Sequence, residues 1–489
     1  MYRHSFYPLF FLTILMVAVG QMTQTLYVPS IPMMAGDFHV ASGQLQAVMA
    51  CYLIPYGLSQ FVYGPLSDRI GRRPVLIIGM MIFLVGTLTI QLIPSFTALL
   101  AGSLIQGLGT GAGGAMSRTV MRDRYSGAEL NRANSLVSMG VIFSPLLAPV
   151  LGGWLTELFN WRAGYWFLFG FGALTTLALL AWFGETLPAS ARQHSLRVGA
   201  AYRHVLGNPR FQGNLLCLMA TFAGLAVFEA AAGVLLGDVL KLSARTVSVL
   251  FVLPLPGYLF GAWLSARLSF RLSQGKLMRL GIAFLALGSL IILVPGLLGM
   301  VSAASLVGGA AVYFIGSGIL YPTATSCAIE PFPGQAGTAG AVLGGMQNLG
   351  AGVVTLLAAS FPMTGQVTLG AIMTVMVLIV ALSFVWLRHH GAPHEQMAVC
   401  HGQEPAPLAG FLLPPAGWRD AAGEWKGGCR AGKEKARRDD GLFWIGTPEM
   451  PLPVWALEPS VQGGDLIWPQ ASRSGRACSI ARRQTPCLV

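Results

Sequence analysis

Charged residues are scarce in this chain. Asp, Glu, Lys and Arg make up 10% of its 489 residues, and 54% of the residues are hydrophobic, whereas a soluble globular domain is roughly 25% charged. Acids are the scarcest, because residues 1–388 hold only 9 of the 19 Asp and Glu. So few charges do not provide the surface of an ordinary soluble domain, and the composition therefore indicates a membrane protein.

Signals of other protein classes are also missing. Strand-like alternation of polar and apolar residues is absent, which argues against a β-barrel. The seven cysteines show no metal-ligand spacing, and no cluster of catalytic side chains lies at membrane depth. We therefore expect neither an enzyme nor a metal site.

Nucleotide-binding motifs do not explain the sequence either. No P-loop motif occurs, so ATP is not the expected energy source. The segment "GTGAGG" at 109–114 matches the spacing G-x-G-x-x-G, but no strand precedes it, as a dinucleotide site requires. We interpret its small residues as helix-packing positions and expect no cofactor.

Twelve apolar runs of about 20 residues are present, and each is long enough to cross a hydrocarbon core as a helix. They lie near 8–28, 44–64, 75–93, 97–117, 133–156, 162–183, 211–236, 246–266, 277–296, 300–322, 337–360 and 366–387. The sequence therefore predicts an all-α membrane protein with twelve transmembrane helices.

The basic residues predict how these helices are oriented, because cytoplasmic loops carry an excess of Lys and Arg. If residue 1 lies in the cytoplasm, seventeen Lys and Arg of residues 1–388 fall in cytoplasmic loops, and only Arg162, Lys241 and Arg245 fall in outer loops. We therefore predict that both termini are cytoplasmic. The net charge of +12 then needs no nucleic-acid partner.

The loop pattern divides the chain into four parts. We predict a six-helix half at 1–184, a cytoplasmic central loop at 185–210 and a second six-helix half at 211–388, as in transporters built from two repeats. Residues 389–489 are rich in Pro, Gly and Arg without periodicity. We expect a largely disordered cytoplasmic extension there, or an atypical end of the reading frame.

The most specific motif is "GPLSDRIGRR" at 64–73, between the second and third predicted helices. It resembles the loop G-x-x-x-D-R-x-G-R-R of the major facilitator superfamily and agrees with that motif at every defined position. We expect Gly64 to let two helices approach closely, Gly71 to permit a tight turn and Asp68 to cap a helix or pair with an arginine. The resemblance implies a conformational latch, formed by Gly64, Asp68, Arg69, Gly71, Arg72 and Arg73, with Asp123 as a charge partner.

The fifth predicted helix contains "GVIFSPLLAPVLGG" at 140–153. This segment resembles the Gly- and Pro-rich motif of the drug:proton antiporters in the same superfamily, although Ala148 replaces one glycine. Prolines bend a membrane helix and glycines let it pack tightly. The motif residues are Gly140, Pro145, Pro149, Gly152 and Gly153, and the alternative is a generic kinked helix.

One family position departs from the pattern. The fourth predicted helix carries "SLIQG" at 103–107, so Ser103 stands where the family motif R-x-x-Q-G has its arginine. In relatives that arginine is linked with proton transfer. The departure shifts the expected proton chemistry to other ionisable groups.

Polar residues inside the predicted spans are candidates for binding substrate or protons. Polar side chains form one stripe along a face of the first predicted helix and another along a face of the second. The alternative to a binding role for these stripes is ordinary hydrogen bonding between helices. Glu229 lies within "VFEAAAG", in the outer half of its predicted span. The alternative to a binding role is that its side chain extends to the outer membrane surface. The candidates are Gln21, Gln24, Thr25, Tyr52, Tyr56, Gln60 and Glu229.

Five longer stretches resemble one group of multidrug exporters among these antiporters. They lie at 17–32, 109–119, 134–149, 251–263 and 330–352. The resemblance implies a monomeric, proton-driven exporter of amphipathic, often cationic drugs in the bacterial inner membrane. Two alternatives stay open, a proton-coupled importer of a small metabolite and a membrane receptor that does not transport.

Overall fold

The computed structural model describes residues 6–125, 127–188, 192, 198–332, 335–390, 461–462 and 465–466. These belong to two compact units, Met1–His401 and Gly402–Val489. In the second unit the described residues form one antiparallel strand pair, β1 (Val461–Gln462) and β2 (Asp465–Leu466). The rest of the predicted extension 389–489, apart from the last residues of a helix that ends at His390, lies outside the described residues.

The first unit is helical. Its first part contains α1 (Phe6–Thr25), the 3-10 helix η1 (Val28–Ser30), α2 (Ile31–Phe38), the 3-10 helix η2 (Ser42–Leu45), α3 (Gln46–Ile70), α4 (Arg72–Leu92), α5 (Phe96–Arg124), α6 (Gly127–Leu158) and α7 (Trp161–Trp182). Its second part contains α8 (Val198–Leu206), α9 (Pro209–Ala232), the π-helix η4 (Gly233–Val239), α10 (Ala244–Val252), α11 (Leu255–Leu268), α12 (Gln274–Leu297), α13 (Ala303–Ile329), α14 (Ala336–Ala358) and α15 (Gln366–His390).

The predicted all-α fold is confirmed for this unit, and every predicted span overlaps a helix. Among the described residues, ten helical segments are long and apolar enough to cross a membrane. The helices α5 and α6, which cover the predicted spans 97–117 and 133–156, are not in that set. The count of twelve spans and the orientation therefore remain predictions.

Two spans differ in detail from their predicted form. The helix α1 ends at Thr25, and the two short helices η1 and α2 extend the first candidate span to Phe38. The predicted span 246–266 is divided into α10 and α11 at Leu253 and Pro254. Proline has no backbone N–H to donate, so the helical hydrogen-bond ladder is interrupted there.

Side-chain caps fix where several helices begin. The Ser95 side chain accepts a hydrogen bond from the backbone N–H of Ala98, and the Asn208 side chain accepts from Arg210 and Phe211. Such caps satisfy N–H groups that have no partner within the first turn. Pro209 follows directly, at a helix position where a missing N–H costs nothing.

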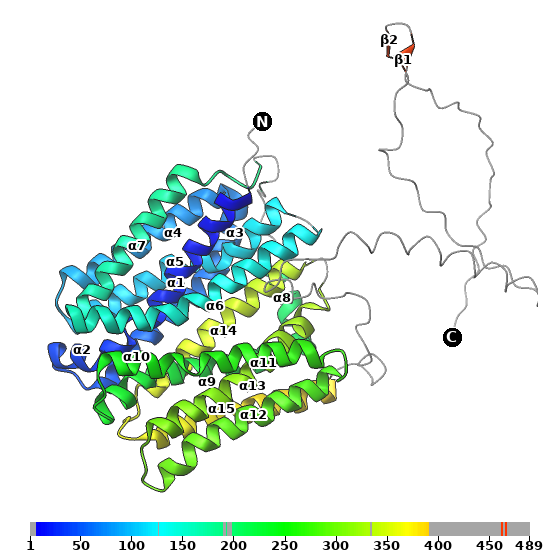
Figure 1. Ribbon diagram of the computed structural model, residues 1–489. Helices are drawn as coiled ribbons and strands as arrows, with labels where there is room; N and C mark the ends of the chain where they lie inside the picture. The colour runs from blue at the N-terminus through cyan, green and yellow to red at the C-terminus, as the bar shows by residue number, and fades with distance from the viewer. Residues whose placement is uncertain are drawn as a thin grey trace, which may run out of the picture. The chain divides into compact units, whose positions relative to one another are not determined.

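The helices gather into two groups, α1–α7 and α9–α15, drawn from blue to cyan and from green to yellow in Figure 1. The groups contact each other mainly through α3 against α14 and α6 against α10. At the first of these contacts, a Cβ atom on Gly57 would lie 2.5 Å from the carbonyl oxygen of Gly345. The division into two halves with the limits 1–184, 185–210 and 211–388 remains a prediction. The helix α8 lies within 185–210.

Substitution of Gly57 tests this close approach. We expect Gly57→Ala to lower the stability of the detergent-solubilised protein by about 1–3 kcal/mol, because a methyl group there would overlap the backbone of α14. The measurement is thermal unfolding followed by loss of the monodisperse peak in gel filtration. Gly64→Ala is the matched control, since a Cβ on Gly64 meets nothing within 4 Å. Equal melting temperatures for the two variants would contradict the contact.

Candidate functional site

The turn between α3 and α4 depends on one glycine. Gly71 ends α3 with φ +103°, a backbone conformation that favours glycine, and its N–H donates to the carbonyl of Ser67 over 3.1 Å. A Cβ atom on Gly71 would also overlap the carboxylate of Glu185. The tight turn expected from the sequence is therefore confirmed. We call this end of the bundle the 64–73 end, and the end where α3 begins the opposite end.

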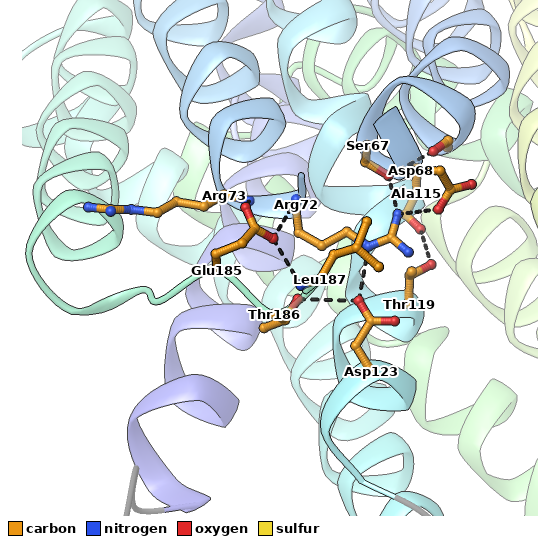
Figure 2. Close-up of polar contacts among 11 residues, drawn as sticks. Ser67, Asp68, Arg72, Arg73, Ala115, Thr119, Asp123, Glu185, Thr186 and Leu187 are labelled. Carbon is orange, nitrogen blue, oxygen red and sulfur yellow. Dashed lines mark hydrogen bonds and ion pairs between the residues drawn. The ribbon is translucent and has the colours of Figure 1, made fainter. Parts of the chain in front are cut away.

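Arg72, the first residue of α4, lies between two acids (Figure 2). Its Nη1 lies 2.6 Å from Oδ1 of Asp68, and its Nε lies 2.9 Å from Oδ2 of Asp123. The side chains of Arg72 and Asp123 are 6% and 16% exposed, against 38% for Asp68. Asp123 is therefore the better shielded partner, and the predicted pairing of these three residues is confirmed.

Glu185 completes this cluster, and the sequence reasoning missed it. Its carboxylate accepts hydrogen bonds from the backbone N–H groups of Arg72 (2.8 Å), Arg73 (3.2 Å) and Leu187 (3.0 Å). A carboxylate at a helix N-terminus satisfies unpaired N–H groups and opposes the positive end of the helix dipole. The segment after α7 is thereby bonded to the start of α4. The scarcity of acids was the available signal, since Glu185 directly follows an apolar span.

Other residues of the predicted latch have different surroundings. Arg73 donates from Nη2 to the carbonyl of Leu180 at 2.8 Å, whereas Arg69 is exposed. The expectation that Gly64 lets two helices approach closely was wrong. A Cβ atom on Gly64 would enter open space, and no described helix packs closely against it. The carbonyl of Gly64 instead accepts from the Ser67 hydroxyl at 2.7 Å, and that hydroxyl also accepts from Arg72 at 2.5 Å.

The Gly- and Pro-rich motif lies where the two helix groups meet. Pro145 and Pro149 are inside α6. Gly140 also belongs to α6, but its surroundings lie outside the described part of the structure. A Cβ on Gly152 would overlap the carbonyl of Leu26, and one on Gly153 would overlap the Ser248 side chain of α10. The glycines therefore let α6 pack directly on its neighbours, and the assignment of this segment to the antiporter motif remains a prediction.

Two further contacts join the groups at the opposite end. Glu157 of α6 accepts a hydrogen bond from the backbone N–H of Arg245, the second residue of α10, over 3.0 Å. The guanidinium carbon of the same arginine lies 5.1 Å from the ring centroid of Trp154. A carboxylate at a helix start and a cation over an indole both stabilise the contact.

The tyrosine stripe on α3 is bonded mainly within its own group. The Tyr52 hydroxyl donates to the carbonyl of Gly20 over 2.7 Å and lies 2.8 Å from the Thr110 hydroxyl. The Tyr52 hydroxyl therefore makes the hydrogen bonds between helices that the alternative describes, and its role in substrate binding remains a prediction. Its ring stacks on Tyr56, with centroids 5.7 Å apart. Gln60 lies farther along α3, close to Gly344 of α14.

Glu229 is bonded across the two groups. Its Oε2 accepts a hydrogen bond from Nε2 of Gln24 at 3.0 Å, which joins α9 to α1. Glu229 is partly buried, and Gln24 is 7% exposed. The carboxylate therefore points toward the other helix group, and the alternative that it reaches for the membrane surface is wrong. Gln21 is half-buried on the same helix as Gln24, and Thr25 is buried there.

The helix that carries Glu229 changes its hydrogen bonding directly afterwards. The π-helix η4 begins at Gly233, and a Cβ on that glycine would overlap the carbonyl of Val28 in η1. Short π-helical turns inside longer helices occur often at functional sites. The change of helix type therefore lies where α9 meets the end of α1.

In the part of the chain that the structure describes, no group of three or more His, Cys, Asp or Glu side chains is placed to hold a metal ion.

Comparison with known proteins identifies the family. The model of the Major Facilitator Superfamily matches residues 13–355. The chain belongs to the major facilitator superfamily. The resemblance expected from the motif at 64–73 is thus confirmed, and the chain is a multi-pass membrane protein of this family.

Individual relatives and a solved structure agree with this assignment. Multidrug resistance protein D of Escherichia coli (strain K12) is 46% identical over 389 residues, which cover 79% of this chain and 98% of that protein. The bicyclomycin resistance protein homolog of Haemophilus influenzae is 24% identical, with 74% and 91% covered. The crystal structure of a D-xylose-proton symporter has a TM-score of 0.63 at 15% identity, with 76% and 97% covered, and shows the fold alone.

Removal of the shared arginine tests the cluster at the 64–73 end. We expect Arg72→Gln to lower the stability by about 1–3 kcal/mol, because the carboxylates of Asp68 and Asp123 would each lose a charged hydrogen-bond donor. The measurement is chemical unfolding of the purified protein.

Lys241→Gln is the matched control. Lys241 lies 2.8 Å from Asp238 in an ion pair whose side chains are 78% and 41% exposed, so its loss should cost well below 1 kcal/mol. A smaller effect for Arg72→Gln than for Lys241→Gln would show that the buried cluster does not stabilise the fold.

Proposed function

We propose that this chain is a proton-driven multidrug exporter of the bacterial inner membrane. It moves amphipathic, including cationic, compounds out of the cytoplasm in exchange for protons. The observation that carries the proposal is the 46% identity to a multidrug resistance protein over 98% of that protein's length. The bonded carboxylate between the two helix groups supplies the ionisable group that such an exchange requires.

The orientation follows from the basic loops. With the 64–73 end in the cytoplasm, Arg69, Arg72 and Arg73 lie on the side where membrane proteins place their positive charge. The opposite end, with Gly152, Gly153 and Glu157, then faces outward. The two helix groups rock against each other so that a central site opens to one side at a time. Loss of the Arg72 cluster or of the glycine contacts shifts the balance between these states.

Glu229 is the residue that we assign to the exchange. A carboxylate can hold a proton or pair with the positive charge of a drug, but the two compete for the same oxygen atoms. A cationic drug that arrives from the cytoplasm displaces the proton, and a proton that arrives from outside displaces the drug. Gln24 holds the carboxylate oxygen at 3.0 Å and so fixes its position toward α1.

The energy for export comes from the proton gradient and the membrane potential. The proton is the coupling ion, and no other cofactor is needed. Each net charge moved across the membrane contributes about 2.3 kcal/mol per 100 mV. The drug and the lipid bilayer are the proposed partners, the chain acts as a monomer without catalysing a reaction, and nucleic acid has no part.

Everted membrane vesicles test the function. We expect addition of tetraphenylphosphonium, a permanent lipophilic cation, to release protons from the acidified lumen of vesicles that contain this chain. Glu229→Gln should lower that release at least about tenfold, or about 1.4 kcal/mol of barrier, because an amide neither binds the proton nor pairs with the cation. The measurement is fluorescence of a pH-sensitive dye inside the vesicles.

Glu330→Gln serves as the control, since it makes the same change at an exposed glutamate. Full activity is expected for it. If the unmodified chain releases no protons, export by proton exchange is wrong. If Glu229→Gln releases protons as fast as the unmodified chain, the role of Glu229 is wrong while the exchange stands.

A further inference from the structure

Four buried polar atoms near the end of α1 have no hydrogen-bond partner among the described residues. They are the hydroxyl oxygens of Thr25 and Tyr27 and both amide atoms of the Gln46 side chain. These residues are 1%, 4% and 0% exposed. Buried polar groups without a protein partner are bonded by buried water in most proteins, because leaving them unbonded costs free energy.

Thr25 differs from other threonines of its helix. The hydroxyls of Thr13 and Thr23 donate to the carbonyls four residues earlier, at 2.9 and 2.6 Å. Those bonds satisfy a buried hydroxyl within the helix itself. Thr25, the last residue of α1, makes no such bond among the described residues. Its hydroxyl therefore remains available to a bound water molecule.

The segments that carry Tyr27 and Gln46 contact the helix that carries Glu229, because η1, which follows Tyr27, and α3, which begins at Gln46, both contact α9. Thr25 directly follows Gln24, whose amide bonds the carboxylate. The Tyr27 hydroxyl is within electrostatic range of Glu229, and the other titratable groups in that range are Tyr165 and Cys51. The polar atoms that lack protein partners therefore begin beside the proposed proton carrier.

Gln46 extends this set toward the opposite end. It is the first residue of α3, and the helix η2 that precedes it contacts η4, the continuation of the helix that carries Glu229. The backbone of Met49, also in the first turn of α3, lies near the Tyr27 hydroxyl without meeting hydrogen-bond geometry. The set therefore includes side chains from the end of α1 and from the start of α3, where the chain turns between these two helices. In the proposed orientation this is the outer surface.

Drugs cannot follow the same route through these contacts. Gly152 packs on the carbonyl of Leu26, and Gly233 packs on the carbonyl of Val28, so that neither position has room for a single methyl group. A proton carried by water bound at Thr25, Tyr27 and Gln46 would not have to pass through these two glycine contacts, because only the room for single water molecules is needed. The opposite end can therefore be closed to an amphipathic drug and open to protons in one arrangement of the helices.

We propose that Thr25, Tyr27 and Gln46 hold a short chain of bound water that carries protons from the outer surface to Glu229. The proposal rests on the proposed exchange and on Glu229 as the proton carrier. It adds a proton entry that is separate from the drug pathway.

The transfer balances without any redox step. A hydronium ion at the outer end gives one proton to the first water, each water passes one proton onward as it accepts another, and the Glu229 carboxylate becomes a carboxylic acid. The hydroxyls of Thr25 and Tyr27 both donate and accept, so they can take part in the chain. The Gln46 amide orients a water by one donated and one accepted bond but passes no proton itself.

Transport by purified protein in liposomes tests this role. In the double variant Tyr27→Phe with Gln46→Met, proton uptake coupled to tetraphenylphosphonium export should fall about tenfold, because the water chain loses its anchors. Exchange of labelled for unlabelled tetraphenylphosphonium, which needs no net proton transfer, should stay within about twofold of the unmodified rate. Equal proton-coupled rates in the variant and the unmodified protein would overturn the proposal, as would equal losses in both assays.

Tyr313→Phe is the matched control for removal of a phenol hydroxyl. Tyr313 is 0% exposed and its hydroxyl also lacks a protein partner among the described residues. It lies against Gly224, on a different part of α9. Both transport rates should be unchanged. A loss of coupling like that of the double variant would contradict the proposal, because loss of any buried phenol hydroxyl would then have the same effect.

Hydroxyl-radical labelling detects the water directly and does not depend on transport. Radicals made by X-ray irradiation modify side chains that touch bound water. Tyr27 and Tyr52 are 4% and 3% exposed, so exposure alone predicts equal labelling. The water chain predicts faster labelling of Tyr27, since the Tyr52 hydroxyl is bonded to protein. Equal labelling of a protein that exchanges protons for drug would reject the water chain and leave the proposed function intact.

Discussion

A carboxylate inside an apolar helix needs a partner, and this constraint connects the two halves of the molecule. Glu229 of α9 finds its partner in Gln24 of α1, 205 residues away in the sequence. A hydrogen bond to a charged oxygen is roughly twice as strong as one between neutral groups. The charge of one side chain therefore sets how strongly α1 and α9 are joined. In the proposed exchange, a proton or a cation at Glu229 changes the relative stability of the arrangements of the halves.

The two ends of the helix bundle are held by different chemistry. At the 64–73 end, carboxylates bond the guanidinium of Arg72 and the backbone at the start of α4. At the opposite end, glycines of α6 and η4 pack on backbone carbonyls and on α10, and one carboxylate, Glu157, bonds the start of α10. Ion pairs re-form with different partners more readily than close backbone packing does. In the proposed function, the first end acts as the latch and the second as a seal.

Local patterns in the sequence predicted local structure well. The spacing of 64–73 predicted the turn at Gly71 and the pairing of Arg72 with Asp68, because those residues are neighbours in the chain. Glu185 was missed since it reaches the start of α4 from 113 residues away. The expected close helix contact at Gly64 was wrong, because a motif does not say which helix packs against each of its residues. Gln24 and Glu229 were each predicted, but their bond depends on how α1 packs on α9.

Infrared difference spectroscopy tests the central claim most directly. Addition of tetraphenylphosphonium to the purified protein should remove the C=O absorption of a protonated carboxyl group as Glu229 gives up its proton. The same addition to Glu229→Gln should leave that region of the spectrum unchanged. A carboxyl band that disappears equally in both proteins, or in neither, would show that Glu229 does not exchange a proton for the drug.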